Sequence, residues 1–305
     1  MRLKSVLACS ALAPLLTGAA GPIRLQPASP WVVDYAKDSC RLARMFGSGK
    51  TATKLAFEST APGQMDMVAI GRPLESDQDQ VAAKFLPVGG ESFKGGFWRT
   101  VDTKEPGVLW SYPRLMPDDW IKKEEQKRKA RTDNPRVRPP AETLADKAEQ
   151  HAAQMAFAAG ITELEVDSSR RHPVILETGP LGDAMKAFDE CSRDSLRDWG
   201  VDPSLEDKIV RPVWAPDPAR WFSSEDYPTE FVRSGEESEV SVRLLVDASG
   251  RVTKCTSLTH FEEPKFEQIV CDKFSRRAKF EPAELADGTK VPSYYINRVI
   301  FRIAR

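Results

Sequence analysis

SEVSVRLLVDASGRV, residues 238–252, is the stretch that decides the fold of the C-terminal part of this chain. Apolar residues occupy every second position of its first half: Val240, Val242, Leu244 and Val246. This alternation predicts a strand with one buried face. The polar DASG at 247–250 predicts a turn, so residues 251–258 are expected to return as the second strand of a hairpin.

The sequence after the hairpin predicts one helix and one last strand. Residues 264–280 carry apolar side chains on one side of a helix: Phe266, Ile269, Val270, Cys271 and Phe274. Asp287-Gly288 predicts a turn, and residues 291–303 predict a long strand. The order hairpin, helix, strand indicates an α+β domain with an antiparallel sheet.

The region resembles the C-terminal domain of the TonB family. The matching pieces are Asp226-Tyr227-Pro228, the stretch 240–252, Phe280-Glu281-Pro282-Ala283, Asp287-Gly288 and Val299-Ile300-Phe301. The resemblance covers residues 226–305 and departs from the family where Ser238 and Glu239 replace a frequent glycine. A cysteine in the second strand and another in the following helix also fit a subgroup of this family.

This resemblance implies a non-enzymatic protein-interaction module that binds an extended peptide by strand addition. The implied partner is another envelope protein, such as a periplasm-facing segment of an outer-membrane receptor, and a second copy of the chain is an alternative. The strand expected to pair lies within 293–302, with these candidate residues: Tyr294, Tyr295, Ile296, Asn297, Arg298, Val299, Ile300 and Phe301. The opposing interpretation is that the edge of this strand is covered.

The N-terminus predicts export. Arg2 and Lys4 precede an uncharged run, residues 5–20, that ends in small residues, which is the order of a cleavable signal peptide. The run is broken by Pro14 and Gly18 and is short for a membrane span of ~20 apolar residues. Cleavage before Gly21 would leave the protein in the periplasm. The alternative is an uncleaved inner-membrane anchor, which would make the chain an atypical TonB-type energy transducer.

Four of the five cysteines lie beyond the predicted signal. An even number in an exported chain indicates disulfides. The four allow three pairings, and the pairing within domains is favoured: Cys40 with Cys191, and Cys255 with Cys271.

Residues 21–200 predict a separate α+β domain of unknown function. Its first part reads as short strands separated by Gly and Pro, and residues 118–140 predict a charged helix followed by a loop. Two further helices are expected over 141–159 and 181–199, and the first has this apolar stripe: Leu144, Ala148, Ala152 and Met155. The proline-rich residues 201–225 predict an irregular connector to the domain at 226–305.

Composition and motifs argue against other classes of function. The net charge is −1, whereas a nucleic-acid binder needs a basic surface. GSGKT at 47–51 lacks the earlier glycine of a phosphate-binding loop, since Arg44 stands there. His151, His172 and His260 lack metal-ligand spacing, so no metal or cofactor is expected. An enzyme activity within residues 31–200 remains an alternative.

Overall fold

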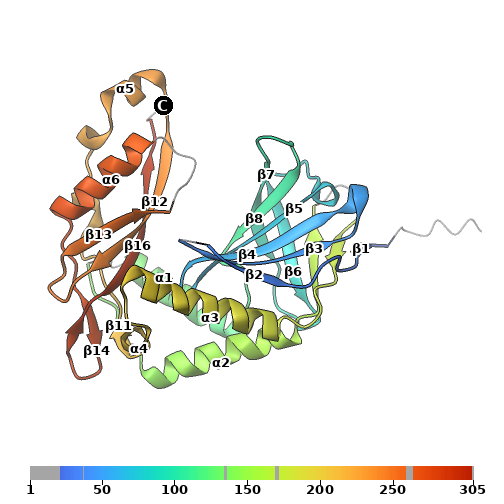
Figure 1. The fold of residues 1–305 in the computed structure, drawn as a ribbon, viewed down its shortest axis with the longest axis horizontal. Coiled ribbons are helices and arrows are strands. Elements are labelled where there is room, and N and C mark those ends of the chain that lie inside the picture. Colours follow the sequence, from blue (N-terminus) through green and yellow to red (C-terminus); the bar gives the residue numbers. More distant parts are fainter. Residues whose placement is uncertain (1–20, 37, 134–135, 169–171, 259–263, 304–305) are drawn as a thin grey trace, which may run out of the picture.

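The computed structural model describes residues 21–303, apart from residues 37, 134–135, 169–171 and 259–263. Residues 1–20 lie outside this range, and so do the predicted signal peptide and His260. The described chain forms a sheet-rich N-terminal region and a C-terminal domain, each with its own hydrophobic core (Figure 1). The predicted α+β class is confirmed.

The N-terminal region is built on one ten-stranded sheet with the order β1-β10-β9-β6-β7-β8-β5-β4-β3-β2. All neighbours are antiparallel except β1 and β10. The strands are β1 (Ile23–Leu25), β2 (Val32–Tyr35), β3 (Cys40–Phe46), β4 (Thr53–Ala61), β5 (Gln64–Gly71), β6 (Gln80–Leu86), β7 (Phe93–Arg99), β8 (Pro106–Ser111), β9 (Glu163–Asp167) and β10 (Val174–Leu176). Short 3-10 turns follow β3 (Gly49–Thr51) and β5 (Arg72–Leu74).

The sheet curves until its two ends meet. The chain that leaves β1 hydrogen-bonds to the end of β3: the amide of Ala28 donates to the carbonyl of Met45 at 2.7 Å, and the amide of Gly47 donates to that of Gln26 at 2.9 Å. The concave face holds the large core side chains, such as Phe57 and Trp110, and α3 (Gly182–Trp199) packs against β2, β3 and β4. The result is a nearly closed barrel with a helix along its side (Figure 1).

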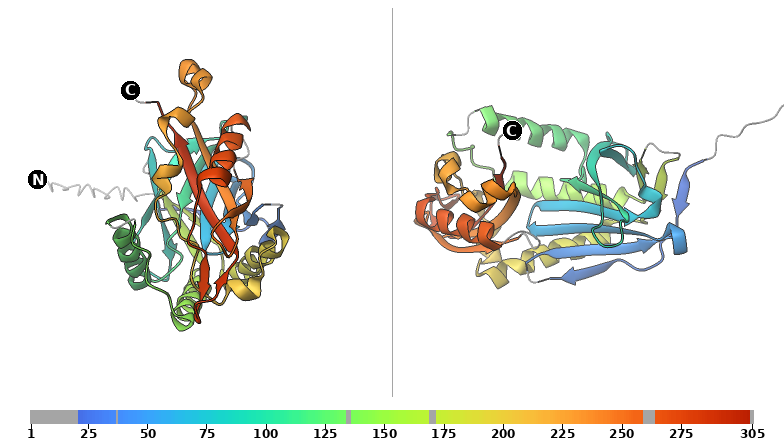
Figure 2. Two further views of the ribbon diagram at one scale, coloured as in Figure 1. Left: turned by 90° about the vertical axis from the view of Figure 1, so that its left-hand side faces the viewer. Right: turned by 90° about the horizontal axis from the view of Figure 1, so that it is seen from above.

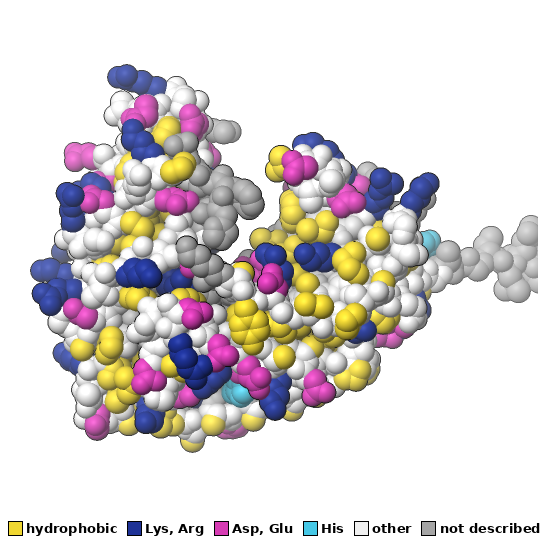
Figure 3. Space-filling view, in the orientation of Figure 1, with side chains coloured by type: hydrophobic (Ala, Val, Ile, Leu, Met, Phe, Trp, Pro, Cys, Tyr) yellow, Lys and Arg dark blue, Asp and Glu magenta, His cyan; other side chains and the backbone are white. Residues whose placement is uncertain are grey.

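The convex face of this sheet carries a row of apolar side chains that is exposed at its two ends. Strand register places Val32, Ala43, Ala56, Val68 and Leu109 in one row across five strands. Val32 is 55% exposed and Leu109 is 39% exposed. Apolar atoms gather on this part of the surface in Figure 3.

Two further helices lie outside the sheet. α1 (Asp118–Asp133) and α2 (Leu144–Gly160) follow one another in the chain, and α1 stands at the outside of the molecule (Figure 2). The predicted apolar stripe of α2 is wrong, because Leu144, Ala148 and Ala152 are exposed. Its inward face instead holds Lys147, Gln150, Gln154, Met155 and Ala158, because this helix borders a cavity rather than a dry core.

The C-terminal domain has the expected hairpin, helix and last strand. β12 (Ser238–Val246) lies between β13 (Val252–Ser257) and β16 (Ser293–Phe301), and α6 (Pro264–Arg277) covers one face. A short helix, α5 (Thr229–Ser234), precedes β12. The hairpin turn requires Gly250, whose φ is +84° and whose missing Cβ leaves room for the carbonyl of Phe280.

The segment between the two parts is more ordered than the prolines predict. It contains α4 (Pro203–Glu206), β11 (Ile209–Arg211) and two 3-10 turns, Pro218–Trp221 and Ser224–Asp226. β11 pairs with β14 (Ala283–Leu285), which pairs with β15 (Lys290–Val291). Side chains of this segment enter the C-terminal core: Ile209, Val213, Ala215 and Trp221. The prolines therefore limit β11 to three residues but do not prevent it from forming.

Candidate peptide-binding edge

β16 is the end strand of its sheet. It pairs with β12 over its whole length, from Ser293 opposite Val246 to Phe301 opposite Ser238. No described strand pairs with its other side. The eight predicted pairing residues therefore all lie on an end strand.

The two ends of β16 have different surroundings. At its start, Tyr294 and Ile296 pack against Trp199, Leu196 and other apolar residues of the N-terminal region. The hydroxyl of Ser293 donates to the carboxylate of Glu206 in α4 at 2.7 Å, and that of Tyr294 donates to the carbonyl of Pro62 at 3.4 Å. The first residues of the predicted pairing strand are thus held against the rest of the protein, unlike its last residues.

The other end of β16 borders a groove of about 360 Å³. One wall is the strand itself and the other is the chain just before α5, and these residues line it: Phe222, Ser223, Ser224, Tyr227, Val299, Ile300, Phe301 and Arg302. Consecutive strand residues point to opposite faces of a sheet. A groove that the consecutive Val299, Ile300 and Phe301 all line therefore lies along the edge of the strand. Ile300 is 50% exposed there.

The second wall is held in place by a buried carboxylate. Asp226 is 8% exposed and forms ion pairs with Lys273 at 2.6 Å and Arg277 at 2.7 Å, both on α6. It also accepts the amide of Ser223 at 2.9 Å. Burial opposes ionisation, but these hydrogen bonds outweigh it and lower the pKa of Asp226 to about 2. The wall therefore keeps a fixed distance from the helix.

Aromatic packing connects this wall to β16. The ring of Tyr227 lies edge-on to Phe301 at 5.3 Å and to Phe266 at 6.0 Å, and its hydroxyl donates to the carbonyl of Glu236 at 2.6 Å. The exposed Arg298 and Arg302 form ion pairs with Glu239 and Glu237. The groove is thus largely apolar and aromatic, with neutralised charges beside it.

A family comparison identifies this domain. Residues 223–303 match the model of the Gram-negative bacterial TonB protein C-terminal. These residues form a TonB C-terminal domain. The match begins at Ser223 and so includes most of the groove wall. TonB C-terminal domains are non-enzymatic and interact with other envelope proteins. No curated protein sequence matches the chain.

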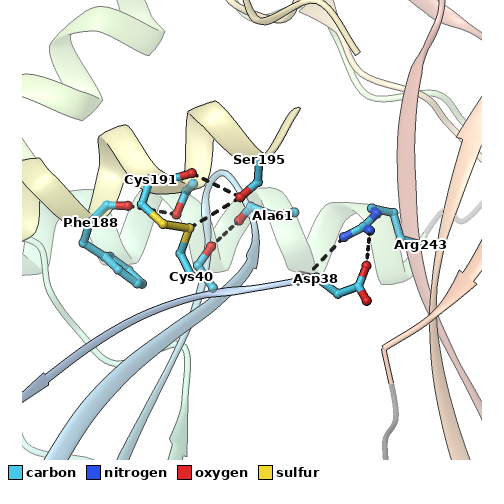
Figure 4. The surroundings of a disulfide bond; sticks show 9 residues. Asp38, Cys40, Ala61, Phe188, Cys191, Ser195 and Arg243 are labelled. Carbon is cyan, nitrogen blue, oxygen red and sulfur yellow. Dashed lines mark hydrogen bonds and ion pairs between the residues drawn. A yellow bond between two sulfur atoms is a disulfide. The ribbon is translucent and has the colours of Figure 1, made fainter. Parts of the chain in front are cut away.

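One cluster that attaches the TonB C-terminal domain to the N-terminal region is centred on Arg243. Arg243, on the outer face of β12, is 3% exposed, donates to the carboxylate of Asp38 at 2.9 Å and stacks over Trp199 at 3.7 Å from the ring centre. Asp38 lies two residues before Cys40 (Figure 4). Trp199 is the last residue of α3, so the helix end and the chain before β3 hold Arg243 together.

The four cysteines form the two favoured pairs. Cys40 of β3 is bonded to Cys191 of α3, and Cys255 of β13 is bonded to Cys271 of α6. The first bond ties α3 to the sheet and is buried (Figure 4). The second ties the helix of the TonB C-terminal domain to the strand at the end opposite β16.

The other motifs form no site in the described chain. GSGKT at 47–51 is a turn between β3 and β4. His151 is exposed and lies 3.3 Å from Asp189, and His172 is half-buried. The described residues hold no cluster of three or more His, Cys, Asp or Glu side chains arranged for a metal. None of the described helices combines the length and apolar character that a membrane crossing requires.

Sequence reasoning missed the second wall of the groove. The prolines on both sides predict that the connector includes Phe222, Ser223 and Ser224. The available signal was the aromatic pair Trp221-Phe222 directly before Asp226-Tyr227-Pro228. Trp221 packs on Phe274 and Phe280, which draws this segment onto the domain.

Proposed function

We propose that the protein is a non-enzymatic interaction protein of the periplasm that binds an extended segment of another envelope protein along the edge of β16. The observation that carries the proposal is the groove beside Val299–Arg302, bordered by the side of β16 with which no strand of the described chain pairs. Such an edge offers backbone donors and acceptors to an incoming strand. A periplasm-facing segment of an outer-membrane receptor is the partner that the TonB C-terminal domain favours.

The length and chemistry of the groove limit the bound segment. The start of β16 is held by the N-terminal region, so we place the pairing on Asn297–Phe301. Phe222, Tyr227 and Ile300 offer apolar contacts to alternate side chains of the segment. The segment is therefore expected to be short, extended and apolar at every second position.

A matched pair of substitutions tests this proposal. Ser224→Trp places a large side chain in the groove, whereas Lys254→Trp places it on exposed β13 at the other end of the sheet. The unaltered chain, immobilised and exposed to envelope extract, should retain a partner that Ser224→Trp loses and Lys254→Trp keeps. Equal retention by both variants, or the absence of any partner that requires residues 226–305, would refute strand addition at this edge.

A further inference from the structure

A large cavity lies in the N-terminal region, outside the groove of β16. Its volume is about 870 Å³, within the range of ~300–1,000 Å³ typical of ligand pockets. The β4–β5 turn, the chain after β8 and the helices α1, α2 and α3 surround it. The cavity is far larger than the space that would be left if one side chain were removed.

The apolar part of the cavity is rich in methionine. Four of the seven methionines of the chain line it, together with a phenylalanine: Met65, Met116, Met155, Met185 and Phe188. Methionine side chains are flexible and polarisable, and they adapt to ligands of different shape. This part of the cavity suits a flexible apolar group.

In the polar part, Lys147 has no hydrogen bond to a carboxylate of the described residues. The four acidic side chains of the lining are each bonded to a basic one: Glu124 and Glu142 to Lys127, Glu125 to Arg114, and Asp189 to His151. Lys147 instead donates to the carbonyls of Glu206 and Ile209 at 3.4 and 3.0 Å. The nearby Glu206 and Asp207 carboxylates are bonded to Ser293 and Arg193.

The position of Lys147 along α2 sets the length of a suitable ligand. Lys147, Gln150, Gln154 and Met155 all line the cavity from one side of the helix. Eight residues separate Lys147 from Met155, which is about 12 Å along the helix axis. A ligand with an anionic head at Lys147 and an apolar tail of about this length reaches the methionines.

α1 covers this cavity without a buried apolar side chain. None of its described side chains is buried, and ion pairs near the surface connect it to its surroundings, such as Lys127 with Glu142 and Glu125 with Arg114. Pairs near the surface contribute ~0–1 kcal/mol each. Displacing α1 when a ligand enters therefore costs little free energy.

We propose that this cavity binds an amphipathic organic anion, with its apolar tail among the methionines, its head at Lys147 and α1 as the cover. The proposal does not depend on strand addition at β16. It adds small-molecule binding to a chain whose recognised domain binds proteins.

Dodecanoate is the probe, titrated into the full chain by calorimetry below its micelle concentration. One saturable site is expected. Butyrate, which lacks the tail, and dodecyltrimethylammonium, which reverses the head charge, should bind about tenfold more weakly or worse. The absence of saturable dodecanoate binding would overturn the proposal, and equal binding of the cationic probe would overturn the role of Lys147.

Two matched pairs of variants place the site. Gln154→Trp fills the cavity, whereas Ala152→Trp adds the same side chain on the exposed side of α2. Lys147→Gln removes the cation, and Lys122→Gln removes an exposed one on α1. The first member of each pair should weaken dodecanoate binding about tenfold, or about 1.4 kcal/mol, and the second should leave it unchanged.

Unchanged binding in both cavity variants would refute the site, and so would equal losses within both pairs. Circular dichroism checks that each variant folds. If Gln154→Trp does not fold, the lysine pair decides the question alone.

Discussion

At the scale of single residues, Arg243 is a main contact between the TonB C-terminal domain and the rest of the protein. Its guanidinium is buried between the carboxylate of Asp38 and the ring of Trp199. The alternation of residues 240–246 puts Arg243 on the face opposite Val242 and Leu244, where water is the expected neighbour. Only the meeting of segments more than 40 residues apart explains why this polar face is covered.

Replacing Arg243 should therefore weaken the protein. Arg243→Met removes the ion pair and leaves the Asp38 carboxylate, whose side chain is 17% exposed, without its cation. We expect the free energy of unfolding to fall by about 2 kcal/mol, the usual effect of losing a hydrogen bond to a charged group. Urea denaturation measures this loss. Arg298→Met is the control, because its pair with Glu239 is exposed and should change stability by less than ~1 kcal/mol. Equal effects of the two substitutions would contradict the account.

Asp226 gives a pH-dependent prediction. Its pKa of about 2 lies below the ordinary value of ~3.9, so its contribution to stability is present above pH ~4 and is lost as the pH falls toward 2. Asp226→Asn should lower the free energy of unfolding by about 2 kcal/mol at pH 7 and have little effect near pH 2. Urea denaturation at both pH values tests this, with the exposed Asp272→Asn as control. A pH-independent difference would rule out the ion pairs as its cause.

At the scale of secondary structure, the elements with a regular pattern were predictable. β12 spans the predicted residues 238–246, and the helix predicted over 181–199 is α3, in which Met185, Phe188, Cys191 and Leu196 are buried. Its end at Gly200 follows from a φ of +86°. In these elements local pattern and burial agree.

Other elements depend on contacts that the local sequence does not report. β7 contains Gly95 and Gly96, which disfavour a strand, yet a Cβ at Gly95 would collide with the ring of Trp110. The three residues of β1 are defined only by parallel pairing with β10, about 150 positions away. The groove wall before α5 is likewise defined only by its position beside β16, which lies far away in the sequence.

The two disulfides should contribute unequally to stability. Cys40 and Cys191 are 151 positions apart, whereas Cys255 and Cys271 are 16 apart. In the chain-entropy model these loops correspond to about 5 and about 3 kcal/mol. We therefore expect the Cys40→Ser/Cys191→Ser variant to unfold at lower urea concentration than Cys255→Ser/Cys271→Ser. The reverse order would show that packing, rather than loop closure, dominates.

At the scale of the whole molecule, the N-terminal region contacts the TonB C-terminal domain at several places. Arg138 adds a further link, since its guanidinium binds Glu281 and the carbonyls of Pro212 and Pro282. Such contacts leave the groove end of β16 open while its start is held. We interpret the N-terminal region as a support that presents the edge.

The first residues give a prediction about the place of the molecule in the cell. We predict that the mature protein begins at Gly21, because the signal-like run ends there. N-terminal sequencing of the protein from the envelope tests this. A start at Met1 would instead favour the membrane-anchored alternative.

Site-specific photo-crosslinking in living cells tests strand addition at β16 most directly. A photoreactive phenylalanine analogue replaces Ile300 in the groove or Lys254 on the opposite end strand. The account predicts an adduct with a second envelope protein from position 300, mapped to one extended segment, and none from position 254. No adduct from position 300, the same adduct from both positions, or only an adduct with a second copy of the chain would contradict it.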